Sequence, residues 1–117
     1  MPTREQIQTA IEDYIDAVGR HDLDATLAVF ADDAVQEDPI GTPPNVGKDA
    51  IRAFFVQSYS APFTTELTGP LLITGNYAAV HFTINVETGG DPFVVRAIDV
   101  MTFDEDCKVT EVRAIVD

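Results

Sequence analysis

The sequence predicts an α+β fold in which a curled, mostly antiparallel sheet wraps around helices. Apolar residues recur at three- and four-residue steps in the first half of the chain, whereas they alternate with polar residues in the second half. Helices followed by consecutive strands favour this class over a parallel α/β sheet. The 117 residues are expected to form one domain, residues 1–117, with a single core.

Three helices are expected in the first half. Thr3 followed by Gln6 resembles a capping box at the start of the first helix, and Gly19 suits its end. A second helix is expected over about residues 23–30, and a third follows Gly47. The apolar stripe of the first helix consists of Ile7, Ala10, Ile11, Tyr14 and Val18.

Strands are expected through the second half. A short strand also lies within residues 33–44, before a loop that three prolines stiffen. The segment Thr88–Asp91 is typical of a hairpin turn. The later strands are expected near Phe63–Leu67, Leu71–Thr74, Ala78–Val86, Phe93–Phe103 and Val109–Val116.

Charge and composition narrow the function classes. Seven basic against 20 acidic residues give a net charge of −13, which argues against nucleic acid or an anionic membrane surface as a partner. A single cysteine, Cys107, excludes an internal disulfide framework, and His21 and His81 lack metal-ligand spacing, so no metal is expected. No secretory signal or membrane-length apolar run is visible, so a cytoplasmic location is expected.

One residue breaks the alternation of the strand at Phe93–Phe103. Asp99 shares its parity with five apolar residues, so an acid is expected on an apolar face. Desolvation without a cation favours the neutral acid, which can donate a hydrogen bond. The alternative is that Asp99 lies near a strand end or a bulge, or bonds to the main chain.

Two further residues allow a structural and a functional interpretation. Tyr14 lies on the apolar stripe of the first helix, either as a ring at the core edge with its hydroxyl in water, or as a donor aimed into a cavity. Asp38 shares the parity of Ala34 and Gln36 just before Pro39. It is either a turn residue in an acidic loop or a carboxylate held at the mouth of a cavity.

The most specific segments of the chain are Tyr14, the run Phe30–Ala34, the Asp-Pro-x-Gly segment Glu37–Gly41, the run Gly47–Phe54 and the late pair Ile98–Asp99. Together they resemble bacterial ketosteroid isomerases (steroid Δ5-3-ketoisomerases), within the nuclear transport factor 2-like and SnoaL-like superfamily. The resemblance covers nearly the whole chain. It implies a conical α+β barrel around three helices, an apolar pocket, a homodimer and no cofactor.

The resemblance also implies an isomerase that moves the double bond of 3-oxo-Δ5 steroids into conjugation. Asp38 matches the general base that transfers a proton from C4 to C6. Tyr14 and Asp99 match the two donors of the oxyanion hole that holds the dienolate. Candidates for the pocket lining, or for plain core packing, are Phe54, Phe55, Val80, Phe82, Ile84, Val86, Ala97, Met101 and Val116.

Two positions depart from the family. Phe55 stands where members usually carry a tyrosine bonded to the first-helix tyrosine, and Val116 stands where an aromatic ring is frequent. Neither departure removes one of the three proposed catalytic groups. Two rival functions stay open for other reasons. One is a polyketide-cyclase-like enzyme on the same fold, and the other is a non-catalytic carrier of steroid-like apolar ligands. An apolar outer face with Val94, Ile98 and Val100 is expected to form the dimer interface.

Overall fold

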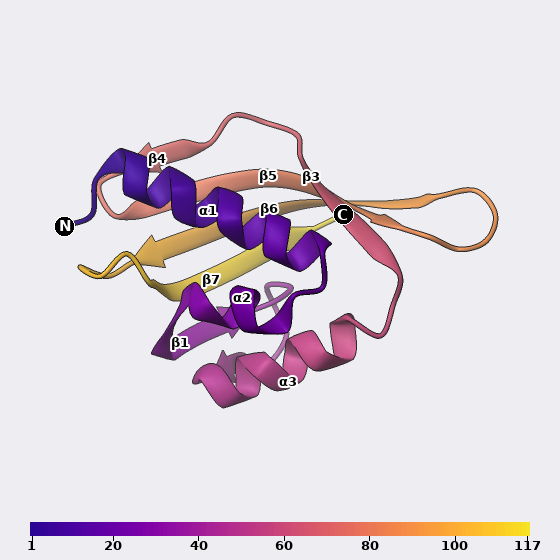
Figure 1. The fold of residues 1–117 in the computed structure, drawn as a ribbon, viewed down its shortest axis with the longest axis horizontal. Helices are drawn as coiled ribbons and strands as arrows, with labels where there is room; N and C mark the ends of the chain where they lie inside the picture. Colours follow the sequence, from indigo (N-terminus) through magenta and orange to yellow (C-terminus); the bar gives the residue numbers. More distant parts are fainter.

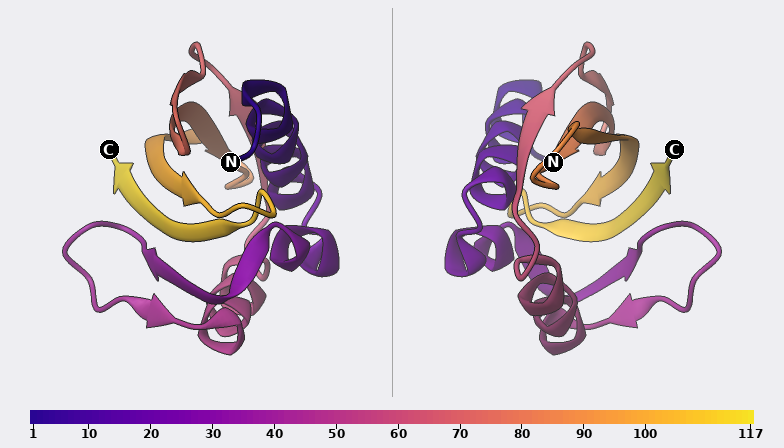
Figure 2. Two further views of the ribbon diagram at one scale, coloured as in Figure 1. Left: turned by 90° about the vertical axis from the view of Figure 1, so that its left-hand side faces the viewer. Right: turned by 90° about the vertical axis from the view of Figure 1, so that its right-hand side faces the viewer.

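The computed structural model describes residues 1–117. Its three helices are α1 (Arg4–Gly19), α2 (Leu23–Ala28) and α3 (Lys48–Ser58). Figures 1 and 2 show a strongly curved sheet with the helices packed along one side of it. The seven strands are β1 (Phe30–Glu37), β2 (Asn45–Val46), β3 (Phe63–Leu67), β4 (Leu72–Thr74), β5 (Tyr77–Val86), β6 (Phe93–Phe103) and β7 (Val109–Val116).

The sheet is an open, mixed sheet. Its strand order is β2-β1-β7-β6-β5-β3, and β4 pairs with β5 beside this path. Every pair is antiparallel except β1 with β7. The α+β class with a curled, mostly antiparallel sheet is therefore confirmed. The end strands β2 and β3 do not pair, so the sheet curves around the helices without closing into a barrel.

The first helix begins as the sequence predicts. The Thr3 side chain accepts from the Gln6 amide, and the Gln6 side chain accepts from the Thr3 amide, which completes the capping box. The buried stripe packs against the sheet, and all of its residues except Ala17 belong to the main core cluster. That stripe consists of Ile7, Ile11, Tyr14, Ile15, Ala17 and Val18.

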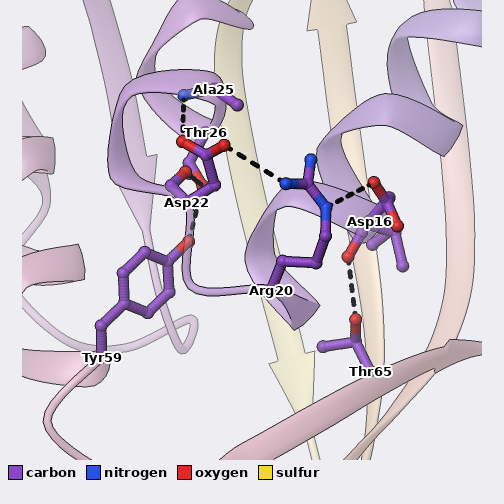
Figure 3. A network of polar contacts seen from close by, with 8 residues as sticks. Asp16, Arg20, Asp22, Ala25, Thr26, Tyr59 and Thr65 are labelled. Carbon is purple, nitrogen blue, oxygen red and sulfur yellow. Dashed lines mark hydrogen bonds and ion pairs between the residues drawn. The ribbon is translucent and has the colours of Figure 1, made fainter.

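The end of α1 differs in detail from the expectation. Gly19 is the last helical residue, and the left-handed position falls on His21 instead (φ 57°). A small residue is needed at position 19 for another reason, because a Cβ there would collide with the Thr65 hydroxyl. That hydroxyl donates to the Ile15 carbonyl over 2.8 Å and ties β3 to α1. Figure 3 shows this bond within the polar network that joins α1, α2 and α3.

The second helix is shorter than predicted, because the sheet captures its expected last turn. It ends at Ala28, and Phe30 is already the first residue of β1. The Val109 amide donates to the Val29 carbonyl over 2.9 Å, so this segment joins the β7 ladder. The two-residue strand β2 was not predicted, since it is too short to show alternation.

None of the three helices combines the length and the apolar character that crossing a membrane would require. The strands expected in the second half are all present. Both β3 and β4 pair with β5 rather than with each other. The β5–β6 hairpin projects beyond the rest of the sheet, as Figure 1 shows.

Candidate functional site

The sheet pairing brings two carboxyl groups close to each other. Val100 of β6 stands opposite Arg113 of β7, and Arg113 stands opposite Glu37 of β1. The backbones at Glu37 and Val100 are therefore two strand spacings apart, about 10 Å. Asp99 precedes Val100, and Asp38 follows Glu37 just beyond the end of β1. The charge of Asp38 acts on Asp99 across this short distance.

Asp99 is buried in the middle of β6, with 3% of its surface exposed. Its ladders to β5 and β7 show no irregularity at this position, and its carboxyl makes no hydrogen bond within the chain. The interpretations as a strand-end, bulge or main-chain-bonded residue are therefore wrong. Burial raises the pKa of Asp99 well above its usual range, and the nearby Asp38 charge raises it further, so the neutral acid is favoured.

Tyr14 reaches the same region from α1, and 4% of its surface is exposed. Its ring packs edge-on against Phe30 and Phe55, with centroids 5.7 Å and 6.4 Å away. Burial raises the pKa of the Tyr14 hydroxyl well above its usual value, followed in size by the charges of Asp99 and Asp38. Tyr14 is therefore not a core-edge ring with its hydroxyl in water, and it lies within electrostatic reach of both acids.

Asp38 is half-buried where the chain leaves β1. Burial raises the pKa of its carboxyl to about 6, and its carboxyl has no hydrogen-bond partner within the chain. The two acids therefore respond differently to neutral pH. Asp38 is mostly ionised there, whereas burial favours the neutral form of Asp99.

The predicted lining residues fall into three groups by burial. Val80, Phe82, Ala97, Met101 and Phe55 are buried in the core cluster. Three others, Phe54, Ile84 and Val86, are half-buried. Val116 stands opposite Ala97, in the row next to Asp99 toward the open end of the sheet, and its exposed fraction is 39%.

Sequence reasoning missed one polar residue of this region. Gln36 is fully buried on the same face of β1 as Ala34. Its Oε1 accepts from Asn45 Nδ2 of β2 over 2.9 Å, and its Nε2 has no partner. It is the only fully buried side-chain nitrogen or oxygen without a partner in the protein. The alternation of β1 could have identified it, because Gln36 has the same parity as Ala34 and Asp38.

Two hollows of the surface lie away from these residues. One of about 480 Å³ lies between the end of α1 and the start of β3, beside His21 and Tyr59. An apolar one of about 350 Å³ lies near β4, beside Leu72 and Val100. Neither is lined by the Tyr14, Asp38 and Asp99 group. No cluster of three or more His, Cys, Asp or Glu side chains is arranged to hold a metal ion.

Comparison with known proteins gives a consistent picture. The SnoaL-like domain family matches residues 11–112. A protein of Nocardioides simplex named Steroid Delta-isomerase is 37% identical over 109 residues, which is 93% of this chain and 88% of the relative. A solved structure of SalBIII, an epoxide hydrolase/cyclase-like enzyme in pyran ring formation in the polyether salinomycin, superposes with a TM-score of 0.87. It is 27% identical and covers 100% of this chain and 95% of its own. The chain therefore belongs to the SnoaL-like family, within the nuclear transport factor 2-like fold.

Proposed function

We propose that the protein is a steroid Δ-isomerase that converts 3-oxo-Δ5 steroids to their conjugated Δ4 isomers. Similarity over most of the chain to the relative named Steroid Delta-isomerase supports isomerase activity. The observation that carries the finer assignment is that Asp38, Asp99 and the Tyr14 hydroxyl lie within electrostatic reach of one another. This group combines an acid that is ionised near neutral pH with one whose neutral form burial favours.

The first step needs a base. Asp38 is the group whose pKa, about 6, leaves it ionised near neutral pH and still basic enough to accept a proton. It removes the C4 proton next to the ketone. The electron pair of that C–H bond passes into the ring, and negative charge develops on the ketone oxygen of the dienolate.

The second requirement is stabilisation of that oxygen. Tyr14 and protonated Asp99 each carry an O–H group, and neither donates to another group of the chain. Both can therefore donate to the dienolate oxygen in a site that largely excludes water. Protonated Asp38 then returns its proton to C6. This division between one ionised and one neutral acid is the established pattern of ketosteroid isomerases.

The substrate would be apolar apart from its ketone, which fits the wall around the three groups. Apolar side chains of β5, β6 and α3 share the core cluster with Tyr14, and partly buried Phe54 and Ile84 pack against that cluster. We propose that the steroid rings lie against Phe54, Phe55, Val80, Phe82, Ile84, Val86, Ala97, Met101 and Val116. No cofactor takes part in this reaction.

The outer face of the sheet supports a homodimer. Val94 and Val100 of β6 and Ile115 of β7 expose 48%, 41% and 51% of their surfaces. Apolar side chains gathered on one face of a sheet are typical of a surface that a partner covers. Sedimentation velocity at micromolar concentration is expected to give a dimer, and a monomer there would contradict this part of the proposal.

The test of the function is a direct turnover assay. The protein is mixed with a 3-oxo-Δ5 steroid, and the ultraviolet absorbance of the conjugated enone is followed. We expect enone to form far faster than in buffer. Steroid binding without enone would favour the carrier instead.

The structural similarity to SalBIII supports a second candidate, a cyclase acting through the same acids. A cyclase would be inactive on the steroid. It would also close a ring on a polyether or polyketide precursor that the isomerase leaves unchanged.

A further inference from the structure

Gln36 is the most unusual buried group in the molecule. Its side chain is fully enclosed on the face of β1 that also carries Ala34. Asn45 Nδ2 donates to Gln36 Oε1 over 2.9 Å, which fixes the carbonyl end of the amide on the β2 side. The Nε2 end therefore points elsewhere, and it has no hydrogen-bond partner.

A buried donor without a partner is costly to a folded protein. Such groups are rare in native structures, because burial removes the hydrogen bonds that water would supply. An apolar residue of similar shape would avoid this cost, and Ala34 and Val112 show that the surrounding positions accept apolar side chains. A role outside folding is therefore the better explanation for an amide at position 36.

Asp38 is two residues after Gln36 and continues its parity just beyond the end of β1. Residues two apart in an extended chain are about 7 Å apart at their backbones, within the reach of a glutamine side chain. The Asp38 carboxyl also has no hydrogen-bond partner in the chain. An unused donor and an unused acceptor are therefore close enough to meet through side-chain rotation.

We propose that Gln36 is a positioning residue for Asp38, whose ionised carboxylate accepts a hydrogen bond from Gln36 Nε2 while Asn45 holds the other end of the amide. The bond forms with the carboxylate and is lost when Asp38 takes up a proton. Its significance for catalysis rests on the proposed isomerase function, but the bond itself does not.

No charged group near Asp38 is placed to stabilise its carboxylate in place of Gln36. Asp99 from β6 and Tyr14 from α1 are the titratable groups within electrostatic reach of Asp38, and burial favours the neutral form of both. Glu37 and Arg113 pair with each other over 3.0 Å on the opposite face of the sheet.

The helix packed against β1, α3, supplies no counter-charge either. Lys48 pairs with Asp32 over 3.6 Å, and Asp49 and Arg52 are exposed. Burial is the only cause that shifts the pKa of Asp38, so no cation stabilises its ionised form.

The direct test measures the protonation of Asp38 without any substrate. The carboxyl carbons of Asp side chains are labelled with carbon-13, and the Asp38 signal is identified by its loss in Asp38→Asn. The wild type and Gln36→Met, which has a similar shape but no donor, are then titrated by NMR. A hydrogen bond to the ionised form lowers a pKa, so we expect Asp38 to titrate about one pH unit higher in Gln36→Met, a tenfold change in proton affinity.

The matched control is Val112→Ala. Val112 stands opposite Gln36 in the adjacent strand and is equally buried, so its truncation disturbs packing without removing a donor. We expect a lower melting temperature with an unchanged Asp38 titration. Gln36→Met should also melt at a lower temperature at neutral pH, because it loses the bonds to ionised Asp38 and to Asn45, so the Asp38 titration is the readout that separates the two variants. Gln36→Leu repeats the test if the methionine variant does not fold.

Activity gives the second readout. In Gln36→Met we expect kcat/KM for the steroid to fall about tenfold on its high-pH plateau, with its acid limb moved to higher pH. An unchanged Asp38 titration in Gln36→Met, or an equal shift in Val112→Ala, would overturn the proposal. Absence of isomerase activity in the wild type would overturn the proposed function instead, and the titration would still test the Gln36–Asp38 bond.

Discussion

Each face of strand β6 carries side chains of a kind that is unusual for its surroundings. Its inner face buries Asp99 between Ala97 and Met101, whereas its outer face exposes Val94 and Val100 to solvent. Soluble proteins ordinarily keep acids outside and gather apolar residues inside. The difference teaches that neither face is explained by the stability of a single chain. An unpaired inner acid is suited to chemistry, and exposed outer valines are suited to association.

The inner face depends most on Asp38. In Asp38→Asn the base is lost while the shape of the side chain is kept. We expect enone formation to fall by up to about 10⁴-fold, while steroid affinity, measured by fluorescence or calorimetry, stays within a few-fold. Turnover at the wild-type rate in this variant would mean that another group is the base.

The two donors opposite Asp38 should matter less individually, because each variant leaves the other donor in place. We expect Tyr14→Phe and Asp99→Ala to lower kcat by about 10²-fold each, below the loss in Asp38→Asn. Stopped-flow or steady-state absorbance measures both. A larger loss in either variant than in Asp38→Asn would reverse the assigned order of importance.

Catalytic activity and folding stability should depend on pH in opposite directions. Asp38 must be ionised to act, so kcat/KM is expected to rise with pH through about 6 and then level off. Stability changes in the opposite direction. An acid whose pKa is higher in the folded state binds more protons there than in the unfolded chain, so the unfolding free energy falls as pH rises.

For Asp38 this loss begins near its ordinary value of 3.8 and is complete above about 6. Asp99 adds a loss of the same sign that continues to higher pH, since its pKa is raised further. We expect Asp99→Asn to weaken this dependence, as measured by urea unfolding across the range. A steeper decline in that variant would contradict a neutral Asp99.

A substitution on the outer face of β6 should abolish dimer formation and leave the fold of the monomer unchanged. Val100 is 41% exposed, so Val100→Asp places a charge where water already reaches. We expect the variant to sediment as a monomer with an unchanged circular dichroism spectrum, because exposed substitutions usually change stability by less than about 0.5 kcal/mol. An intact dimer would place the interface elsewhere.

Alternation and spacing predict much of this molecule, because they record which face of an element is buried. The capping box of α1, the bounds of β6 and β7, and the inward direction of Asp99 all follow from local pattern. Alternation cannot reveal which strands are neighbours. The proximity of Asp38 to Asp99 depends on the parallel pairing of β1 with β7, which brings together segments far apart in the sequence.

The structure departs from the sequence prediction where contacts between distant segments decide the local conformation. The second helix ends early because β7 captures Val29 and Phe30. The left-handed residue after α1 is His21 rather than a glycine, and its Nε2 lies 3.1 Å from the Phe63 carbonyl. The sequence shows that Gln36 shares the parity of Ala34 and Asp38. It does not show that one end of the Gln36 amide bonds to Asn45, because Asn45 lies on a strand that was not predicted.

The protonation state of Asp99 at neutral pH is the sharpest test of the inner face. Carbon-13 NMR of the aspartate carboxyls, with Asp99→Ala to identify the signal, reads it directly. We expect a carboxyl that is still protonated at pH 7.5 and whose signal is missing in the variant, while Asp38 is already ionised. An ionised Asp99 at that pH would contradict a neutral donor facing an ionised base.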